Sequence, residues 1–165
     1  MDIYFMRHGK AQERSSNIAS DSKRALTEVG KKEIENIAKS LNVLGINFDE
    51  IISSPLDRAK QTGEIILKHT KIKKNMIIWD ELKPETDAAK TIAKLAMMKF
   101  NSVLIIGHEP LLTNLVSKII ASEAHVNISL KKGGIIHVRK VQEGTKFVGV
   151  LRSIMTPKQL KKICK

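Results

Sequence analysis

Short apolar runs alternate with amphipathic segments along the whole chain. Apolar residues dominate residues 2–7 and 48–53, and a shorter run covers residues 76–79. Residues 102–106 form a continuous apolar run, which is typical of a strand buried on both faces of a sheet. These four runs predict the strands of one buried sheet.

The segments between these runs have helical spacing. Thr27 is a good N-cap, the apolar residues after it recur at helical intervals, and Gly45 fits the end of the helix. Ser54 and Pro55 predict the start of the next helix, with Ser54 as its cap and Pro55 in its first position. The same patterns predict three more helices: residues 86–98, the segment that Pro110 opens, and a short basic segment from Pro157.

Two more strands are predicted near the C-terminus, at residues 135–141 and 147–151. Their separation by Glu143 and Gly144 indicates a hairpin at an edge of the sheet. The alternation of strands and helices predicts an α/β fold, a three-layer α/β/α sandwich with a mostly parallel central sheet. Because no repeat or linker interrupts the pattern, we expect residues 1–165 to form a single domain.

The composition is that of a globular protein, with 42% hydrophobic and 28% charged residues. The single cysteine, Cys164, excludes a disulfide within the chain, which fits a reducing compartment. The apolar run at the N-terminus is too short for a signal peptide, and no run approaches the roughly 20 apolar residues of a membrane span. We therefore expect a cytoplasmic protein without a membrane partner.

Positive charge is concentrated in the last third of the chain. The net charge is +12, and residues 110–165 contribute +9 of it, with 11 Lys/Arg against two acidic residues. A basic surface can attract nucleic acid, membranes or acidic proteins. Aromatic residues, which stack on bases in nucleic-acid sites, make up only 4% of the chain. We interpret the basic segment as a solvated face and expect no nucleic-acid partner.

Three predicted strands end in polar residues of one chemical kind. The first strand delivers Arg7, His8 and Gly9. The second leads into Arg58 at the start of its helix, and the continuous apolar strand delivers His108. Ligands of such sheets bind beyond the carboxyl ends of the strands. Guanidinium groups and helix N-termini both bind phosphoryl oxygens, so the pattern predicts a site for a phosphate dianion.

Four motifs in this order resemble those of the histidine phosphatase superfamily. Arg7-His8-Gly9 matches its signature at the end of the first strand. The stretches SSPLDRAKQT (residues 53–62) and GHEP (residues 107–110) look like its second and third motifs, and RALTEVG (residues 24–30) resembles the stretch before its first helix. The resemblance covers residue 3 to about residue 140, and it implies a phosphoglycerate mutase-like fold.

The length of the chain favours one branch of this superfamily. Only about 30 residues, including a strand, separate Arg58 from the next helix, so the inserted helices of larger members are missing. The chain is therefore similar to the short SixA-type phosphohistidine phosphatases, whose open site suits a phosphorylated protein. The resemblance implies catalysis by Arg7, His8, Arg58 and His108.

The chemistry of these side chains indicates a covalent mechanism. Neutral His8 attacks phosphorus through one ring nitrogen, while a backbone carbonyl is expected to hold the other nitrogen and select the tautomer. Arg7, Arg58 and His108 bind the phosphoryl oxygens, with Gly9 as a further substrate-binding residue, and water then hydrolyses the phosphohistidine intermediate. The arginines supply the positive charge and the five histidines lack metal-ligand spacing, so we expect no metal and no other cofactor.

The proton donor for the leaving group is the open assignment. Glu81, just after the third strand, is the first candidate, although pairing with Lys83 or Arg58 would explain it equally well. Glu109 follows His108, and its place at a helix start fits a role in the helix dipole as well as one in catalysis.

Three functions remain open from the sequence. The leading hypothesis is a phosphohistidine phosphatase that acts on a phosphorelay protein or another phosphorylated protein. A small-molecule phosphomonoesterase of the same fold would act on phosphate esters instead. A non-catalytic binder of phosphate groups or nucleic acid would use the basic C-terminal third, but such a protein needs the arginines and not His8.

Overall fold

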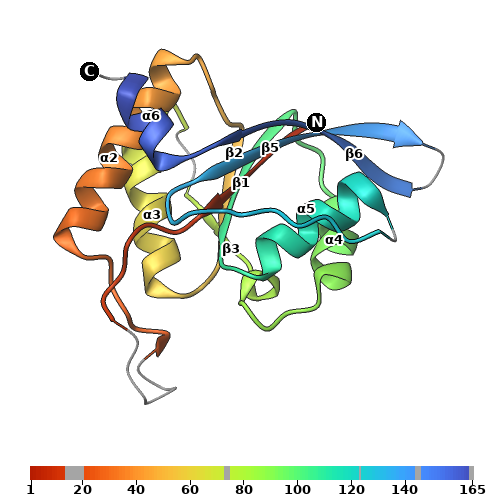
Figure 1. Cartoon of the computed structure of the whole chain (residues 1–165), viewed down its shortest axis with the longest axis horizontal. Coiled ribbons are helices and arrows are strands. Elements are labelled where there is room, and N and C mark those ends of the chain that lie inside the picture. Colours follow the sequence, from red (N-terminus) through yellow and green to blue (C-terminus); the bar gives the residue numbers. More distant parts are fainter. Residues whose placement is uncertain (14–20, 73–74, 123, 144–145, 164–165) are drawn as a thin grey trace.

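The structure of the protein is a computed structural model that describes residues 1–13, 21–72, 75–122, 124–143 and 146–163. Figure 1 shows a central sheet with helices on both faces. From one edge to the other, the six strands are β3 (Ile77–Ile78), β2 (Glu50–Ser53), β4 (Ser102–Gly107), β1 (Asp2–Arg7), β5 (Ile135–Glu143) and β6 (Lys146–Met155).

The first four strands of this order are parallel, and β5 and β6 are antiparallel to their neighbours. One face of the sheet is covered by α2 (Glu28–Val43), α3 (Asp57–Lys68) and α6 (Pro157–Ile163). The other face is covered by α4 (Ala88–Ala96), α5 (Leu111–Ala121) and the short 3-10 helix η1 (Asp80–Leu82). The predicted three-layer sandwich with a mostly parallel sheet is therefore confirmed.

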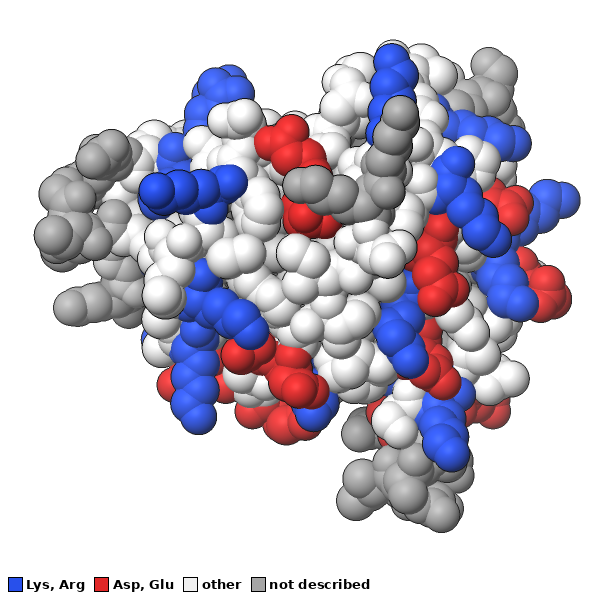
Figure 2. Space-filling model, turned by 180° about the vertical axis from the view of Figure 1, so that it is seen from behind, with Lys and Arg blue, Asp and Glu red and all other residues white. Residues whose placement is uncertain are grey.

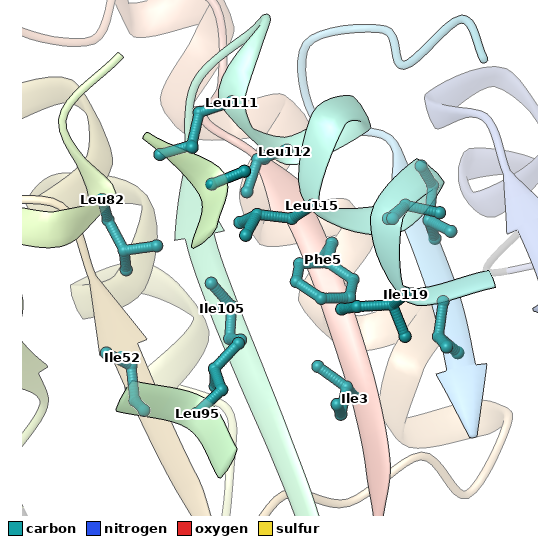
Figure 3. Close-up of a cluster of buried hydrophobic side chains, with 14 of the residues drawn as sticks. Ile3, Phe5, Ile52, Leu82, Leu95, Ile105, Leu111, Leu112, Leu115 and Ile119 are labelled. Carbon is teal, nitrogen blue, oxygen red and sulfur yellow. The ribbon is translucent and has the colours of Figure 1, made fainter. Parts of the chain in front are cut away.

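Strand β1 supplies apolar side chains to both layers, because successive residues of a strand point to opposite faces. Ile3 and Phe5 belong to the cluster formed with α4 and α5, as Figure 3 shows, whereas Tyr4 and Met6 belong to the cluster formed with α2, α3 and α6. The middle of β1 is thus buried on both faces and hydrogen-bonded to β4 and β5 at its edges.

The helix caps agree with the sequence in one case and differ in another. The Thr27 hydroxyl accepts a hydrogen bond from the Gly30 N–H at 3.0 Å, so the predicted cap of α2 is confirmed. The predicted start of α3 is wrong: its N-cap is Leu56, and the helix begins at Asp57. The Ser54 hydroxyl, predicted as the cap, instead lies 2.8 Å from Nε2 of His108, where a buried imidazole needs a partner.

The C-terminal hairpin is at a sheet edge as predicted, but β5 also pairs with β1. In this antiparallel pair Ile135, the first residue of β5, lies opposite Met6. The segment before β5 therefore lies beside the carboxyl end of β1. Figure 2 views the molecule from the side opposite to Figure 1 and shows basic and acidic side chains interspersed. The face in this view therefore has no large patch of a single charge.

We expect Leu115→Ala to lower the free energy of unfolding by about 2–5 kcal/mol, because it leaves a cavity in the cluster between β1 and α5. The matched control is Val43→Ala in α2, whose side chain is 66% exposed; a change within about 0.5 kcal/mol is expected there. Urea unfolding followed by circular dichroism measures both. Equal losses in the two variants would contradict the assigned core.

Candidate active site

A cavity of about 440 Å³ lies where the carboxyl ends of the parallel strands meet. Its lining includes Arg7 and His8 from the end of β1, Arg58 from the first turn of α3, and His108 from the end of β4. The structure thus brings these four predicted site residues together around one space. They come from three separate segments, as parallel strands with crossover helices allow.

His8 is almost completely buried, with 6% of its surface exposed. Its Nδ1 lies 2.7 Å from the carbonyl oxygen of Gly9. Because a carbonyl oxygen can only accept, the Nδ1 atom must carry the proton of this bond. In the neutral ring the Nε2 atom then holds the free electron pair. This is the tautomer-selecting backbone carbonyl that the sequence analysis expected.

Both site histidines are held in the neutral form. Burial, with the nearby Arg58 and Arg7 charges, lowers the pKa of His8 from 6.5 to about 3. Burial, with the adjacent His8 and the same arginines, lowers the pKa of His108 to about 2. A charged imidazole would be both desolvated and repelled in this position. The lone pair that a nucleophile requires is therefore present at neutral pH.

His108 lies beside His8, with 5.0 Å between the ring centroids. Its Nε2 atom meets the Ser54 hydroxyl, and its buried Nδ1 atom has no hydrogen-bond partner among the described residues. A buried polar atom without a partner is uncommon and marks a position that a ligand can satisfy.

The two arginines are oriented by main-chain oxygens. An Arg7 Nη atom donates to the carbonyl oxygen of Leu130 at 2.9 Å. Arg58 is 3% exposed and donates to the carbonyl oxygen of Asp21 at 2.7 Å and to its carboxylate at 3.1 Å. Each guanidinium is thereby fixed at the cavity wall before any ligand arrives, which lowers the entropic cost of binding an anion.

Gly9, predicted to contact the substrate, is not among the residues that line the cavity. Its N–H donates to the Thr62 hydroxyl at 3.1 Å, and that hydroxyl donates to the carbonyl oxygen of Arg58 at 2.7 Å. The only backbone donor of Gly9 is therefore used within the protein. A side chain at Gly9 would also meet Ile34, whose Cγ1 lies 2.8 Å from the position of a Cβ atom. Gly9 links the turn after β1 to α3 and orients His8.

The structure does not bring Glu81 to the cavity. Its carboxylate forms an ion pair with Lys94 of α4 at 2.8 Å, and this hydrogen bond lowers the pKa of Glu81. An ionised, paired carboxylate is poorly suited to donate a proton. The two partners considered from the sequence are paired elsewhere, Lys83 with Asp80 at 2.6 Å and Arg58 with Asp21 at 3.1 Å.

Glu109 does line the cavity. Burial raises the pKa of its carboxyl group, although the Thr113 hydroxyl donates to its Oε2 atom at 2.6 Å. Its Oε1 atom is buried and has no hydrogen-bond partner among the described residues. A partly buried carboxyl group with a raised pKa is suited to act as a general acid. In the sequence, the signal for Glu109 was its position directly after His108 in the third motif.

Several cavity residues were not identified from the sequence: Asp21, Arg24 and Lys132. Arg24 forms an ion pair with Asp21 at 2.8 Å, so the two enter the site as a pair. Lys132 reaches the cavity because the pairing of β5 with β1 brings the segment before β5 beside the carboxyl end of β1. Its only signal in the sequence was a pair of lysines followed by two glycines.

Within the described part of the chain, no three or more His, Cys, Asp or Glu side chains are grouped so that they could hold a metal ion. The described helices are all too short or too polar to cross a bilayer. Cys164 lies outside the described residues.

The chain is similar in sequence to proteins of one known family. The profile of the histidine phosphatase superfamily (branch 1) matches residues 3–88. Phosphohistidine phosphatase SixA of Escherichia coli is 32% identical over 126 residues, which are 74% of this chain and 76% of that protein. The chain belongs to the histidine phosphatase superfamily. Its relatives support a phosphatase, a hydrolase of phosphoric bonds.

Two further relatives extend this result over nearly the whole chain. An uncharacterised protein of Picosynechococcus is 32% identical over 142 residues, 84% of this chain and 85% of that protein. The solved structure of the protein histidine phosphatase SixA complexed with tungstate superimposes with a TM-score of 0.84 at 28% identity, covering 97% of this chain and 99% of that one. The predicted resemblance to short SixA-type members of the histidine phosphatase superfamily is confirmed.

We expect the free energy of unfolding to fall as the pH falls below the ordinary histidine pKa. Unfolded His8 and His108 gain protons near pH 6.5, whereas the folded residues stay neutral down to about pH 3 and about pH 2. The folded state is therefore most stable above about pH 6.5 and becomes less stable below it, because protons then bind only the unfolded histidines. At about pH 5 each histidine should lower the free energy of unfolding by about 2 kcal/mol relative to its value at about pH 7.

Urea unfolding at the two pH values measures this effect in the wild type and in His8→Asn and His108→Asn. Each of these variants should lose less stability between the two pH values than the wild type. His125→Asn is the control, because His125 is exposed. Identical pH slopes in all four proteins would show that the site histidines are not buried in neutral form.

Proposed function

We propose that the protein is a metal-independent phosphohistidine phosphatase that acts on a phosphorylated protein, with His8 as nucleophile. The observation that carries this proposal is the neutral, buried His8 whose Nδ1–H is held by the Gly9 carbonyl beside two arginines and a second histidine. Such an arrangement provides a nucleophilic Nε2 atom and a positively charged cavity for the group it attacks.

The first step transfers the phosphoryl group to His8. The Nε2 lone pair attacks phosphorus in line with the leaving group, and a new N–P bond forms as the bond to the substrate breaks. For phosphohistidine the electron pair of the breaking bond returns to an imidazole nitrogen, which is readily protonated. The Nδ1–H of His8 stays on the Gly9 carbonyl, so the positive charge of the intermediate ring is stabilised by that oxygen.

The second step is hydrolysis. Water attacks the phosphorus of phospho-His8, the N–P bond breaks, and its electron pair restores the neutral ring with inorganic phosphate as product. In this proposal Arg7, Arg58 and an Nδ1–H group of His108 stabilise charge on the phosphoryl oxygens in both transition states. The positive charge is provided by side chains, so the proposal includes no metal.

Two observations favour a protein substrate. The solved relative is a protein histidine phosphatase, and its bound tungstate is a tetrahedral oxyanion like phosphate. Between α3 and α4 the described residues, which leave out 73–74, form only β3 and η1, so this part of the chain provides no inserted helices around the leaving group. A small ester gains little binding energy from an open site. The competing function is a phosphomonoesterase that uses the same nucleophile.

We expect His8→Ala to lower kcat/KM at least about 1,000-fold while tungstate still binds, because the arginines and His108 remain. Turnover is measured with a phosphohistidine protein in the presence of EDTA, and tungstate binding is measured by calorimetry. Quenching into alkaline detergent, which preserves phosphohistidine, should trap a labelled phosphoenzyme only when His8 is present.

The control for this experiment is His125→Ala, which removes an exposed histidine outside the cavity and should retain wild-type turnover. Undiminished turnover in His8→Ala would overturn the nucleophile. Loss of all turnover in EDTA, restored by a divalent cation, would overturn metal independence.

Two isosteric variants test the source of the leaving-group proton. We expect Glu109→Gln to slow hydrolysis of an aryl or alkyl phosphate by about 10- to 100-fold and that of phosphohistidine by much less, because an alkoxide needs the proton more. Glu81→Gln is expected to leave both rates within about twofold, because Glu81 is bound to Lys94 outside the cavity. The measurement is kcat/KM of each variant for both substrates. A selective loss of ester hydrolysis in Glu81→Gln would show that Glu81, and not Glu109, donates the proton.

A further inference from the structure

A second cavity, of about 540 Å³, opens beside the catalytic one. Arg7 and Lys132 line both cavities, so a ligand can extend from the phosphoryl site into the second space without leaving the protein surface. We call this second space the lysine trough after the lysines in its lining: Lys10, Lys131, Lys132, Lys158 and Lys161.

The positive charge of the lysine trough is largely uncompensated. Lys161 is neutralised by an ion pair with Glu33 at 2.6 Å. None of the other four lysines forms an ion pair with a carboxylate of the described residues. Burial and the charges of Arg7 and Arg24 lower the pKa of Lys132, which shows how closely the cations are gathered. An anionic ligand would relieve this repulsion.

The lysine trough is held rigidly relative to the nucleophile. The Gly133 N–H donates to the carbonyl oxygens of Arg7 at 2.9 Å and His8 at 3.2 Å, so the segment with Lys131 and Lys132 is bound to the catalytic turn. Gly133 has a φ of +78°, and a Cβ atom there would lie 3.6 Å from Pro157 at the start of α6. The backbone next to Lys131 and Lys132 is therefore fixed beside the catalytic turn and packs close to the start of α6, which carries Lys158.

The shape and chemistry of the trough select the class of ligand. A phosphoryl group at His8 lies in the catalytic cavity, so a ligand that also reaches the lysines of the neighbouring trough must be extended. Sites for single-stranded nucleic acid combine basic grooves with aromatic stacking platforms, and the described lining of the lysine trough contains no aromatic residue. Lysines act as flexible point charges that suit carboxylates of varied geometry.

We propose that the lysine trough binds acidic side chains that flank the phosphohistidine on the partner protein. The inference rests on the proposed function and names its partner: a protein whose phosphorylated histidine lies in an acidic surface. Binding across both cavities orients the phosphoryl group at Nε2 of His8, and the lysines steer the encounter.

Two peptides that carry the same phosphohistidine test the proposal, one flanked by Asp and Glu and the other by Asn and Gln. We expect the wild type to favour the acidic peptide about tenfold in kcat/KM at low ionic strength, and to lose most of this preference when salt shortens the screening length. Lys131→Gln combined with Lys158→Gln should reduce the preference to about twofold or less. The rate for the amide peptide should stay near that of the wild type, because neither lysine lines the catalytic cavity.

Lys90→Gln combined with Lys99→Gln is the matched control. These exposed lysines lie in and just after α4, on the opposite face of the sheet, and the net charge changes by the same amount. The control should keep the full preference for the acidic peptide. Equal kcat/KM values for the two peptides in the wild type, or equal losses in the two double variants, would overturn the proposal.

A binding experiment separates failure of this inference from failure of the proposed function. If neither peptide is hydrolysed while a small ester is, the phosphohistidine function fails. Fluorescence anisotropy with unphosphorylated forms of the same peptides then tests the trough alone, and tighter binding of the acidic form that is lost in the Lys131/Lys158 variant supports it. Binding of single-stranded RNA or anionic vesicles through these lysines, without binding of the acidic peptide, would overturn it.

Discussion

The burial of strand β1 on all four sides is the constraint on which the rest of this molecule depends. The strand is hydrogen-bonded to β4 and β5, and its alternating side chains enter the apolar clusters on both faces of the sheet. A shift of β1 by one residue would exchange these faces, so its register is strongly specified. Arg7 is its last residue and His8 follows directly, so the core fixes the position of the proposed nucleophile.

The polar groups around His8 form a second layer of constraint. The Gly9 carbonyl holds the imidazole, the Gly9 N–H is held by Thr62, and Thr62 is held by the carbonyl of Arg58. This chain of bonds connects the first turn after β1 with the first turn of α3. Burying two neutral histidines costs stability as the pH falls, but it supplies a nucleophile that is unprotonated at neutral pH.

The antiparallel strand β5 gives the site its asymmetry. A parallel strand in this position would bring its carboxyl end to the cavity, whereas β5 brings its beginning, with Lys132 and the paired glycines before it. The catalytic cavity is consequently bordered on this side by lysines rather than by a helix N-terminus. This geometry joins the catalytic cavity to the lysine trough. It is the reason why we propose a partner protein with an acidic surface.

Local signals in the sequence determined most of the fold and the candidate site residues. Apolar runs and helical spacing predicted the strands and helices, because buried elements require these periods whatever surrounds them. Arg7, His8, Arg58 and His108 could be identified because each lies at, or a few residues after, the carboxyl end of a strand, and these ends meet in a parallel sheet. Only contacts between distant segments decided the rest. Lys94 draws Glu81 away from the cavity while burial raises the pKa of Glu109 within it, and Ser54 serves His108 instead of capping α3. These outcomes depend on which buried polar group finds a partner, and such pairing exists only once the chain has folded.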